Sequence, residues 1–169
     1  MVLVSDVDEI PNPEAIVEMR KWGCLENGMS VAFRQTLYAY HLNWRHVRPW
    51  YGTRAVCYGN LTEPQHLRST MGLRYADEPV IEDGGWSFSS FGGPPDVVRK
   101  LTSFSHTACA APEYANEAHV ATCIAEGRGI LPDDGNEYIW SEIDETYPAY
   151  LRENLERYGH WLGQRSVAG

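Results

Sequence analysis

Residues 1–8 read Met1-Val2-Leu3-Val4-Ser5-Asp6-Val7-Asp8. The first four are apolar, and the run stops abruptly at a serine and two acids. A short apolar run that ends in this way is typical of a buried parallel strand that meets a functional loop at its carboxyl end. We therefore predict a strand over residues 1–4 and a candidate site in the loop that follows it.

A strand at the first residue has a consequence for the rest of the fold. Buried strands need neighbours, so we expect the strands that should precede this one to be missing or to be supplied from elsewhere. The sequence thus suggests either an absent amino-terminal segment or a partner chain that completes the fold.

The remaining chain alternates helical and strand patterns, which predicts an α/β fold with a mixed sheet flanked by helices. Asn12 and Pro13 are typical of a helix start, and Gly127 of a helix stop. Helices are predicted over 13–22, 63–67, 96–101, 116–126 and 148–158. Strands are predicted over 30–42 and 53–58, with a loop over 43–52 between them and a turn at 82–85.

Composition and charge restrict the number of domains and the kinds of partner. The chain has 169 residues, 43% of them hydrophobic, enough for one folded domain, which we place at 1–163 with a disordered tail at 164–169. A formal charge of −9 argues against nucleic acid as a partner, since phosphate contacts need clustered basic residues. No signal or membrane-spanning segment is evident in this chain, so we expect a soluble, cytoplasmic protein.

Two carboxylates separated by one residue suit a hard divalent cation. Asp6 and Asp8 can offer oxygen ligands to Mg²⁺ or Mn²⁺ and leave positions open for phosphate oxygens. Glu9 adds a third acid, and three adjacent carboxylates repel one another unless a cation is present. The same pattern in isolation often only caps the helix that follows.

A phosphatase of the haloacid-dehalogenase type is an alternative for these residues. Such enzymes also place Asp-x-Asp after an apolar strand, with the first acid as nucleophile and the second as general acid. Their motif continues to Thr or Val two residues after the second acid, where this chain has Ile10 followed by Pro11. No later lysine and paired acids complete that site.

Five motifs occur in the order seen in glycosyltransferase family 17, and the chain resembles that family over nearly its whole length. The family includes the β-1,4-mannosyl-glycoprotein β-1,4-N-acetylglucosaminyltransferases that add bisecting GlcNAc. The motifs are Ser5-Asp6-Val7-Asp8-Glu9-Ile10-Pro11-Asn12-Pro13, Pro49-Trp50-Tyr51-Gly52-Thr53-Arg54, Gly84-Gly85-Trp86-Ser87-Phe88-Ser89, Ser103-Phe104-Ser105-His106 and Pro148-Ala149-Tyr150-Leu151.

The resemblance implies a glycosyltransferase-A-like fold, a UDP-sugar donor, a divalent metal (Mn²⁺ or Mg²⁺) and an inverting transfer of GlcNAc to a glycan acceptor. Asp6 and Asp8 match the family's metal motif. We assign Asp8 to direct ligation and Asp6 to the ribose or a metal-bound water. His106 is the candidate for a further metal or diphosphate ligand, although by itself it would be read as an ordinary helix-end histidine.

Two departures from the family bear on catalysis. The family usually has Gly-Trp-His-Phe-Ser where this chain has Ser87 in place of the histidine, so one imidazole is absent. Family members also carry a substantial segment before the Asp-x-Asp strand, and in glycosyltransferase-A folds that segment builds most of the uridine pocket. The alternative to an active enzyme is therefore a catalytically incomplete remnant that binds metal or sugar.

The remaining candidate residues have roles in transfer and substrate binding. An inverting transfer needs a base for the acceptor hydroxyl, and we choose Asp83 first and Glu82 second, although either could be a solvated turn acid. Arg54 is the candidate for the diphosphate, because a guanidinium fork suits phosphate oxygens. Aromatic side chains are candidates for acceptor binding by stacking on sugar faces, or for plain packing: Trp86, Trp50 and Tyr51.

Overall fold

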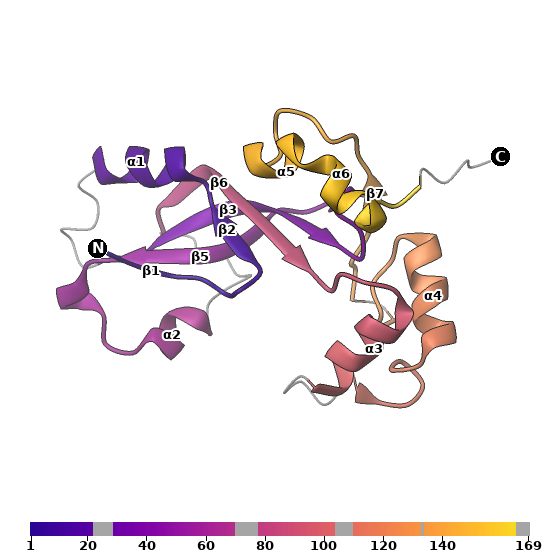
Figure 1. Cartoon of the computed structure of the whole chain (residues 1–169). Coiled ribbons are helices and arrows are strands. Elements are labelled where there is room, and N and C mark those ends of the chain that lie inside the picture. The colour runs from indigo at the N-terminus through magenta and orange to yellow at the C-terminus, as the bar shows by residue number, and fades with distance from the viewer. Residues whose placement is uncertain (22–28, 70–77, 104–109, 133, 165–169) are drawn as a thin grey trace. The chain divides into compact units, whose positions relative to one another are not determined.

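The computed structural model describes residues 1–21, 29–69, 78–103, 110–132 and 134–164, and the chain divides into two compact units (Figure 1). Unit 1 comprises Met1–Leu37 and Arg48–Ser87, and unit 2 comprises Tyr38–Val47 and Phe88–Gly169. The α/β class is confirmed, because the chain forms strands flanked by helices. The glycosyltransferase-A-like topology and the proposed domain limits, 1–163 and 164–169, stay predictions.

The chain passes from unit 1 into unit 2 within β3 and again within β6, so each unit contains elements from two stretches of the sequence. Unit 1 contains β1 (Val2–Val4), β2 (Glu9–Pro11), α1 (Pro13–Lys21), most of β3 (Val31–Ala39), β5 (Trp50–Val56), α2 (Pro64–Arg68) and most of β6 (Val80–Ser89). Unit 2 contains β4 (Trp44–His46), α3 (Pro94–Ser103), α4 (Glu117–Glu126), β7 (Tyr138–Trp140), α5 (Ala149–Glu153) and α6 (Leu155–Tyr158). Short 3-10 turns occupy Tyr58–Asn60 and Gly159–Trp161.

Helix α1 begins at the predicted residue because its start is encoded locally. The Asn12 side chain accepts a hydrogen bond from the backbone N–H of Glu14 at 3.1 Å, and Pro13 occupies the first helical position, where no N–H is needed. Buried Ala15 and Met19 lie one turn apart and so share one face of the helix.

That face of α1 packs on the strands of unit 1 and forms its core. Burial of these apolar side chains is the main source of stability for the unit, at roughly 25 cal/mol per Å² removed from water. The buried members are Ala15, Met19, Val31, Phe33, Ala55 and Ile81, with Leu3 and Ile16 packed against them.

The direction of the first strand differs from the prediction. β1 is a strand, as expected, but it pairs antiparallel with β5, with Leu3 opposite Ala55, and its residues are only half-buried. The expectation of a buried parallel strand is therefore wrong. β1 lies at one end of the strand order, and a run of three apolar residues does not encode the direction of its partner.

Unit 2 has its own core, between α3, α4 and the ends of β3 and β7. Asn116 caps α4 by accepting from the backbone N–H of His119 at 2.9 Å, and Gly127 ends the helix in the left-handed conformation, as predicted. The buried core residues are Ala39, Tyr40, Val97, Val120, Cys123 and Ile130.

Three further predictions need correction. The 43–52 loop contains strand β4 and the start of β5, and the helix predicted over 148–158 is broken at Asn154 into α5 and α6. The turn predicted at 82–85 lies inside β6, where Asp83 and Gly85 adopt positive φ angles of 49° and 125°. These residues bend the strand without ending it, so the glycine pair marks an irregularity in a strand.

Gly85 has a steric role that its substitution should expose. It lies opposite Pro11 in the β2–β6 pair, and a Cβ on it would collide with the Ile10 carbonyl oxygen. Gly85→Ala is therefore expected to lower the free energy of unfolding by about 1–3 kcal/mol or more, measured by urea denaturation. Gly59→Ala is the matched control, since nothing lies within 4 Å of a Cβ there; equal losses in the two variants would contradict this reading.

None of the helices in the described ranges is long and apolar enough to cross a membrane.

Candidate functional site

The two acids of the Asp-x-Asp motif lie in a tight turn between β1 and β2. The backbone N–H of Glu9 donates to the Asp6 carbonyl at 3.1 Å and closes the turn. Val7, between the two acids, is fully exposed, and both aspartates are partly exposed. The turn thus projects from the sheet, with both candidate ligands accessible to a bound molecule.

Glu9 anchors this turn to the sheet. Its side chain is buried, and one carboxylate oxygen accepts from the Trp50 indole at 2.7 Å. The other oxygen accepts from the Asp6 backbone N–H at 3.1 Å and from the Thr53 hydroxyl at 3.4 Å. Ser5 adds a second link, because its hydroxyl lies 2.6 Å from that of Thr53. The third acid of the motif therefore faces inward and positions the first two.

The space for the Glu9 carboxylate depends on Gly52. A Cβ at Gly52 would collide with the carboxylate of Glu9 and with the side-chain oxygen of Gln35. Gly52, in the second family motif, is therefore explained by the buried Glu9 in the first motif.

Burial raises the pKa of the Glu9 carboxyl; the hydrogen bond from Trp50 opposes this shift, and the charges of Asp6 and Asp8 add to it.

Asp6 forms an ion pair that the sequence did not suggest. Its Oδ1 lies 2.5 Å from Nη2 of Arg68, the last residue of α2, which packs near β1. The two side chains remain 37% and 49% exposed, so the pair is accessible to solvent. An arginine from a distant part of the sequence thereby lies on the first acid of the motif.

The carboxylates suit a divalent cation only together with another oxygen donor. Among the described residues, no three His, Cys, Asp or Glu side chains converge on a point where a metal ion could be held. Glu9 is directed toward Trp50, which leaves two aspartates. Mg²⁺ and Mn²⁺ sites of one or two carboxylates completed by substrate phosphates are common, so Asp6 and Asp8 fit a metal that arrives with a diphosphate.

The family model for glycosyltransferase family 17 matches residues 1–162, which is nearly the whole chain. The chain belongs to glycosyltransferase family 17. The match covers the Asp-x-Asp turn and both compact units. Searches of curated proteins and of solved structures found no match. Family 17 membership implies a sugar donor and an acceptor.

Arg54, predicted to bind the diphosphate of a family 17 donor, is fully buried. Its Nε lies 3.0 Å from a Glu78 carboxylate oxygen, and Nη1 donates to the Tyr51 and Gly52 carbonyls at 2.9 and 3.0 Å. The guanidinium thereby holds the segment that accommodates Glu9. Its contact with phosphate stays a prediction, and the observed contacts give it a structural role.

The two candidate bases lie on the bent part of β6 and differ in their contacts. Glu82 is exposed and pairs with Arg34 at 3.0 Å. Asp83 is exposed, has a positive φ, and its carbonyl accepts from the Asn12 side chain at 3.1 Å. Ser87, four residues further along β6, pairs with Glu9, so Asp83 lies roughly 13 Å along the strand from the residue that follows the Asp-x-Asp turn.

The aromatic candidates for acceptor binding lie on β5 and β6. Trp86 is partly exposed and stands opposite Ile10 in the β2–β6 pair, directly beside the motif. Trp50 donates its indole N–H to Glu9, and Tyr51 follows it in β5, both partly exposed. Stacking on sugar stays a prediction for all three, and Trp50 also has the structural task of holding Glu9.

Two positions singled out in the family motifs have different outcomes. His106 lies outside the described residues, so its role as a metal or diphosphate ligand stays a prediction. Ser87, which replaces the usual histidine, is buried and pairs with Glu9, directly after the Asp-x-Asp turn. The departure from the family pattern therefore falls beside the candidate site.

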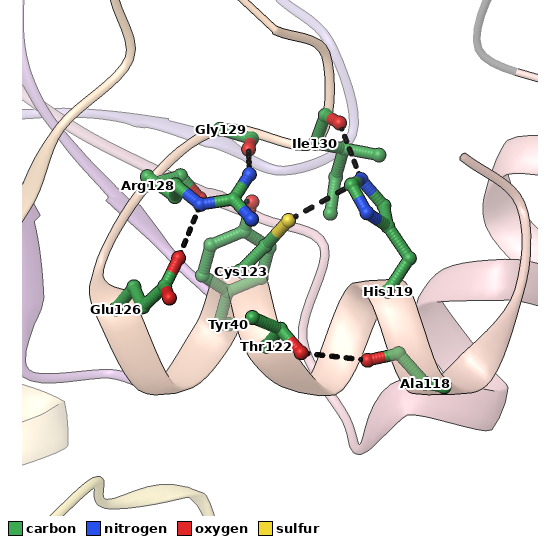
Figure 2. A network of polar contacts seen from close by, with 9 residues as sticks. All are labelled: Tyr40, Ala118, His119, Thr122, Cys123, Glu126, Arg128, Gly129 and Ile130. Atoms are coloured by element: carbon green, nitrogen blue, oxygen red, sulfur yellow. Dashed lines mark hydrogen bonds and ion pairs between the residues drawn. The ribbon is translucent and has the colours of Figure 1, made fainter. Parts of the chain in front are cut away.

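A second cluster of polar side chains lies in unit 2, on α4 and the loop that follows it (Figure 2). His119 Nε2 lies 2.8 Å from the Ile130 carbonyl, which can only accept, so this nitrogen carries the proton. Cys123 lies 3.4 Å from the same nitrogen and cannot give it a proton, and burial raises the pKa of the thiol. The cluster joins α4 to the loop after it, and Tyr40 extends it by donating to the Arg128 carbonyl at 3.2 Å.

Proposed function

We propose that this family 17 protein is a metal-dependent, inverting glycosyltransferase that transfers GlcNAc from UDP-GlcNAc to a hydroxyl of a glycan acceptor. Mn²⁺ or Mg²⁺ is the proposed metal. The observation that carries the proposal is the projecting turn, in which Glu9 faces inward while Asp6 and Asp8 are partly exposed to solvent, within a chain that matches the family model.

Each residue of the turn has a task in this proposal. A bound divalent cation would neutralise the charge that develops on the leaving diphosphate. Asp8 would supply a carboxylate oxygen to it, and Asp6 would face the ribose or a metal-bound water. Glu9 would hold both in place through Trp50 and Thr53, so that little reorganisation is needed when the donor binds.

The acceptor side of the reaction is assigned to β6. Trp86 would stack on an acceptor sugar, and Asp83 would take the proton from its hydroxyl. The positive φ of Asp83 is the kind of local backbone strain that clusters at functional sites. The donor sugar would lie between Asp83 and the Asp-x-Asp turn.

Asp83→Asn tests this assignment. The variant should lose turnover by about 100-fold or more, the range of general-base catalysis, while UDP affinity in Mn²⁺ stays unchanged. Glu82→Gln is the matched control, and it should retain turnover because that carboxylate is engaged by Arg34. Near-normal turnover in Asp83→Asn would remove Asp83 from the mechanism.

Transfer itself is tested with purified chain, a glycan panel and a set of UDP-sugars, with release of UDP as the readout. The proposal predicts acceptor-dependent UDP release, highest with UDP-GlcNAc, that stops with EDTA and returns with Mn²⁺. Equal release without acceptor or in EDTA would contradict it.

A catalytically incomplete binding module is the second candidate function, and Ser87 favours it. The family's usual imidazole is absent from the residue paired with Glu9. This alternative predicts metal-dependent UDP binding without transfer to any glycan in the panel. Membership of family 17 favours sugar transfer over the phosphatase alternative.

A further inference from the structure

The ion pair between Asp6 and Arg68 is a feature of unit 1 that neither the sequence motifs nor the proposed function accounts for. Arg68 ends α2, and its Nη2 lies 2.5 Å from Asp6 Oδ1. A carboxylate that is held by a guanidinium has less capacity to bind a metal ion. In the chain without ligand, the charge of Asp6 is therefore already neutralised by the guanidinium of Arg68.

The Asp6–Arg68 ion pair can be broken at little cost in free energy. Both side chains are more than a third exposed, and exposed ion pairs contribute only about 0–1 kcal/mol. The pair between Arg54 and Glu78 is the contrast, because both of those side chains are buried and their separation would leave charges without solvent. Arg68 can therefore leave Asp6 at little cost, whereas Arg54 cannot leave Glu78.

Arg68 also has the chemistry that the buried Arg54 cannot offer to a ligand. A guanidinium presents five N–H donors in a planar fork that matches phosphate oxygens. The fork of Arg68 lies at the turn where the diphosphate of a donor would meet the metal, and it is accessible from solvent.

We propose that Arg68 is a diphosphate-binding residue that neutralises Asp6 in the empty chain and transfers to the donor diphosphate when a hydrated divalent cation binds at the turn. This inference rests on the proposed function. The guanidinium keeps the turn free of an uncompensated charge in the absence of ligand. With donor bound, it adds positive charge where the leaving group becomes more negative.

Arg68→Gln separates the two states, because its effects on metal and on UDP have opposite signs. Manganese binding alone, followed by the electron paramagnetic resonance signal of free Mn²⁺, should become tighter by up to about fivefold, since the competing ion pair is gone. UDP binding in saturating Mn²⁺, followed by calorimetry, should become weaker by about tenfold to a hundredfold, since a charge-assisted contact is lost.

Matched variants distinguish this role from a structural one. Arg99→Gln removes an arginine from a similarly exposed pair with Asp96 on α3, and it should change neither affinity. Arg68→Lys keeps the charge and loses the fork, so its UDP affinity should lie between those of the wild type and Arg68→Gln.

Each outcome bears on a definite claim. If Arg68→Gln weakens Mn²⁺ and UDP binding together, or leaves both unchanged while the wild type binds both, the inference is overturned and the proposed function stands. If the folded wild type binds neither Mn²⁺ nor UDP, the proposed function fails, and the inference fails with it.

Discussion

Replacing Asp8 by Ala is expected to lower the affinity of the UDP-loaded chain for Mn²⁺ by about a hundredfold or more. Losing a residue that only orients a metal ligand already costs about 10–100-fold, and Asp8 is assigned to direct ligation. Manganese titration by electron paramagnetic resonance, in saturating UDP, measures the change. Asp6→Asn should have a smaller effect, because Asp6 is assigned to the ribose or a metal-bound water.

The control for Asp8→Ala is Glu14→Gln, which removes an exposed acid from the first turn of α1 in the same unit. It should leave Mn²⁺ affinity unchanged. An Asp8→Ala variant that folds and binds Mn²⁺ as the wild type does would remove the Asp-x-Asp turn from the metal site.

Replacing Glu78 by Ala is expected to destabilise the fold by about 3–5 kcal/mol, because the buried guanidinium of Arg54 would lose its counter-charge. The Ser30 hydroxyl, which donates to Glu78 at 2.9 Å, would lose its partner as well. Urea denaturation followed by circular dichroism measures the loss.

Glu82→Ala is the comparison for Glu78→Ala, since it breaks an ion pair of the same length on the surface. Its cost should stay within about 1 kcal/mol. Similar losses of stability in the two variants would show that the Arg54–Glu78 ion pair does not stabilise unit 1. The predicted role of Arg54 in diphosphate binding would then be favoured over its structural role.

Helices α1 and α4 were predictable because their boundaries are encoded by neighbouring residues. The cap at Asn12 and the stop at Gly127 act within one turn of the helices that they bound. Strands β2, β4 and β7 have three residues each and no such local signal. They exist because distant segments pair with them, as Trp44 does with Trp140, and a single sequence does not state those pairings.

The Asp-x-Asp turn was predictable from its residues, whereas its surroundings were not. Local sequence could not show that Glu9 turns inward to Trp50 or that Arg54 is buried against Glu78, because burial is decided by the packed sheet. Arg68 was missed for the same reason. It reaches Asp6 only after the intervening strands bring α2 beside β1.

The most direct test of a metal-dependent UDP-sugar site is calorimetric titration of UDP into the wild-type chain, with and without Mn²⁺. The proposed function predicts saturable binding in Mn²⁺ that is lost when the metal is removed. Binding of equal strength without the metal, or no binding by a chain whose circular dichroism shows that it is folded, would contradict the proposal.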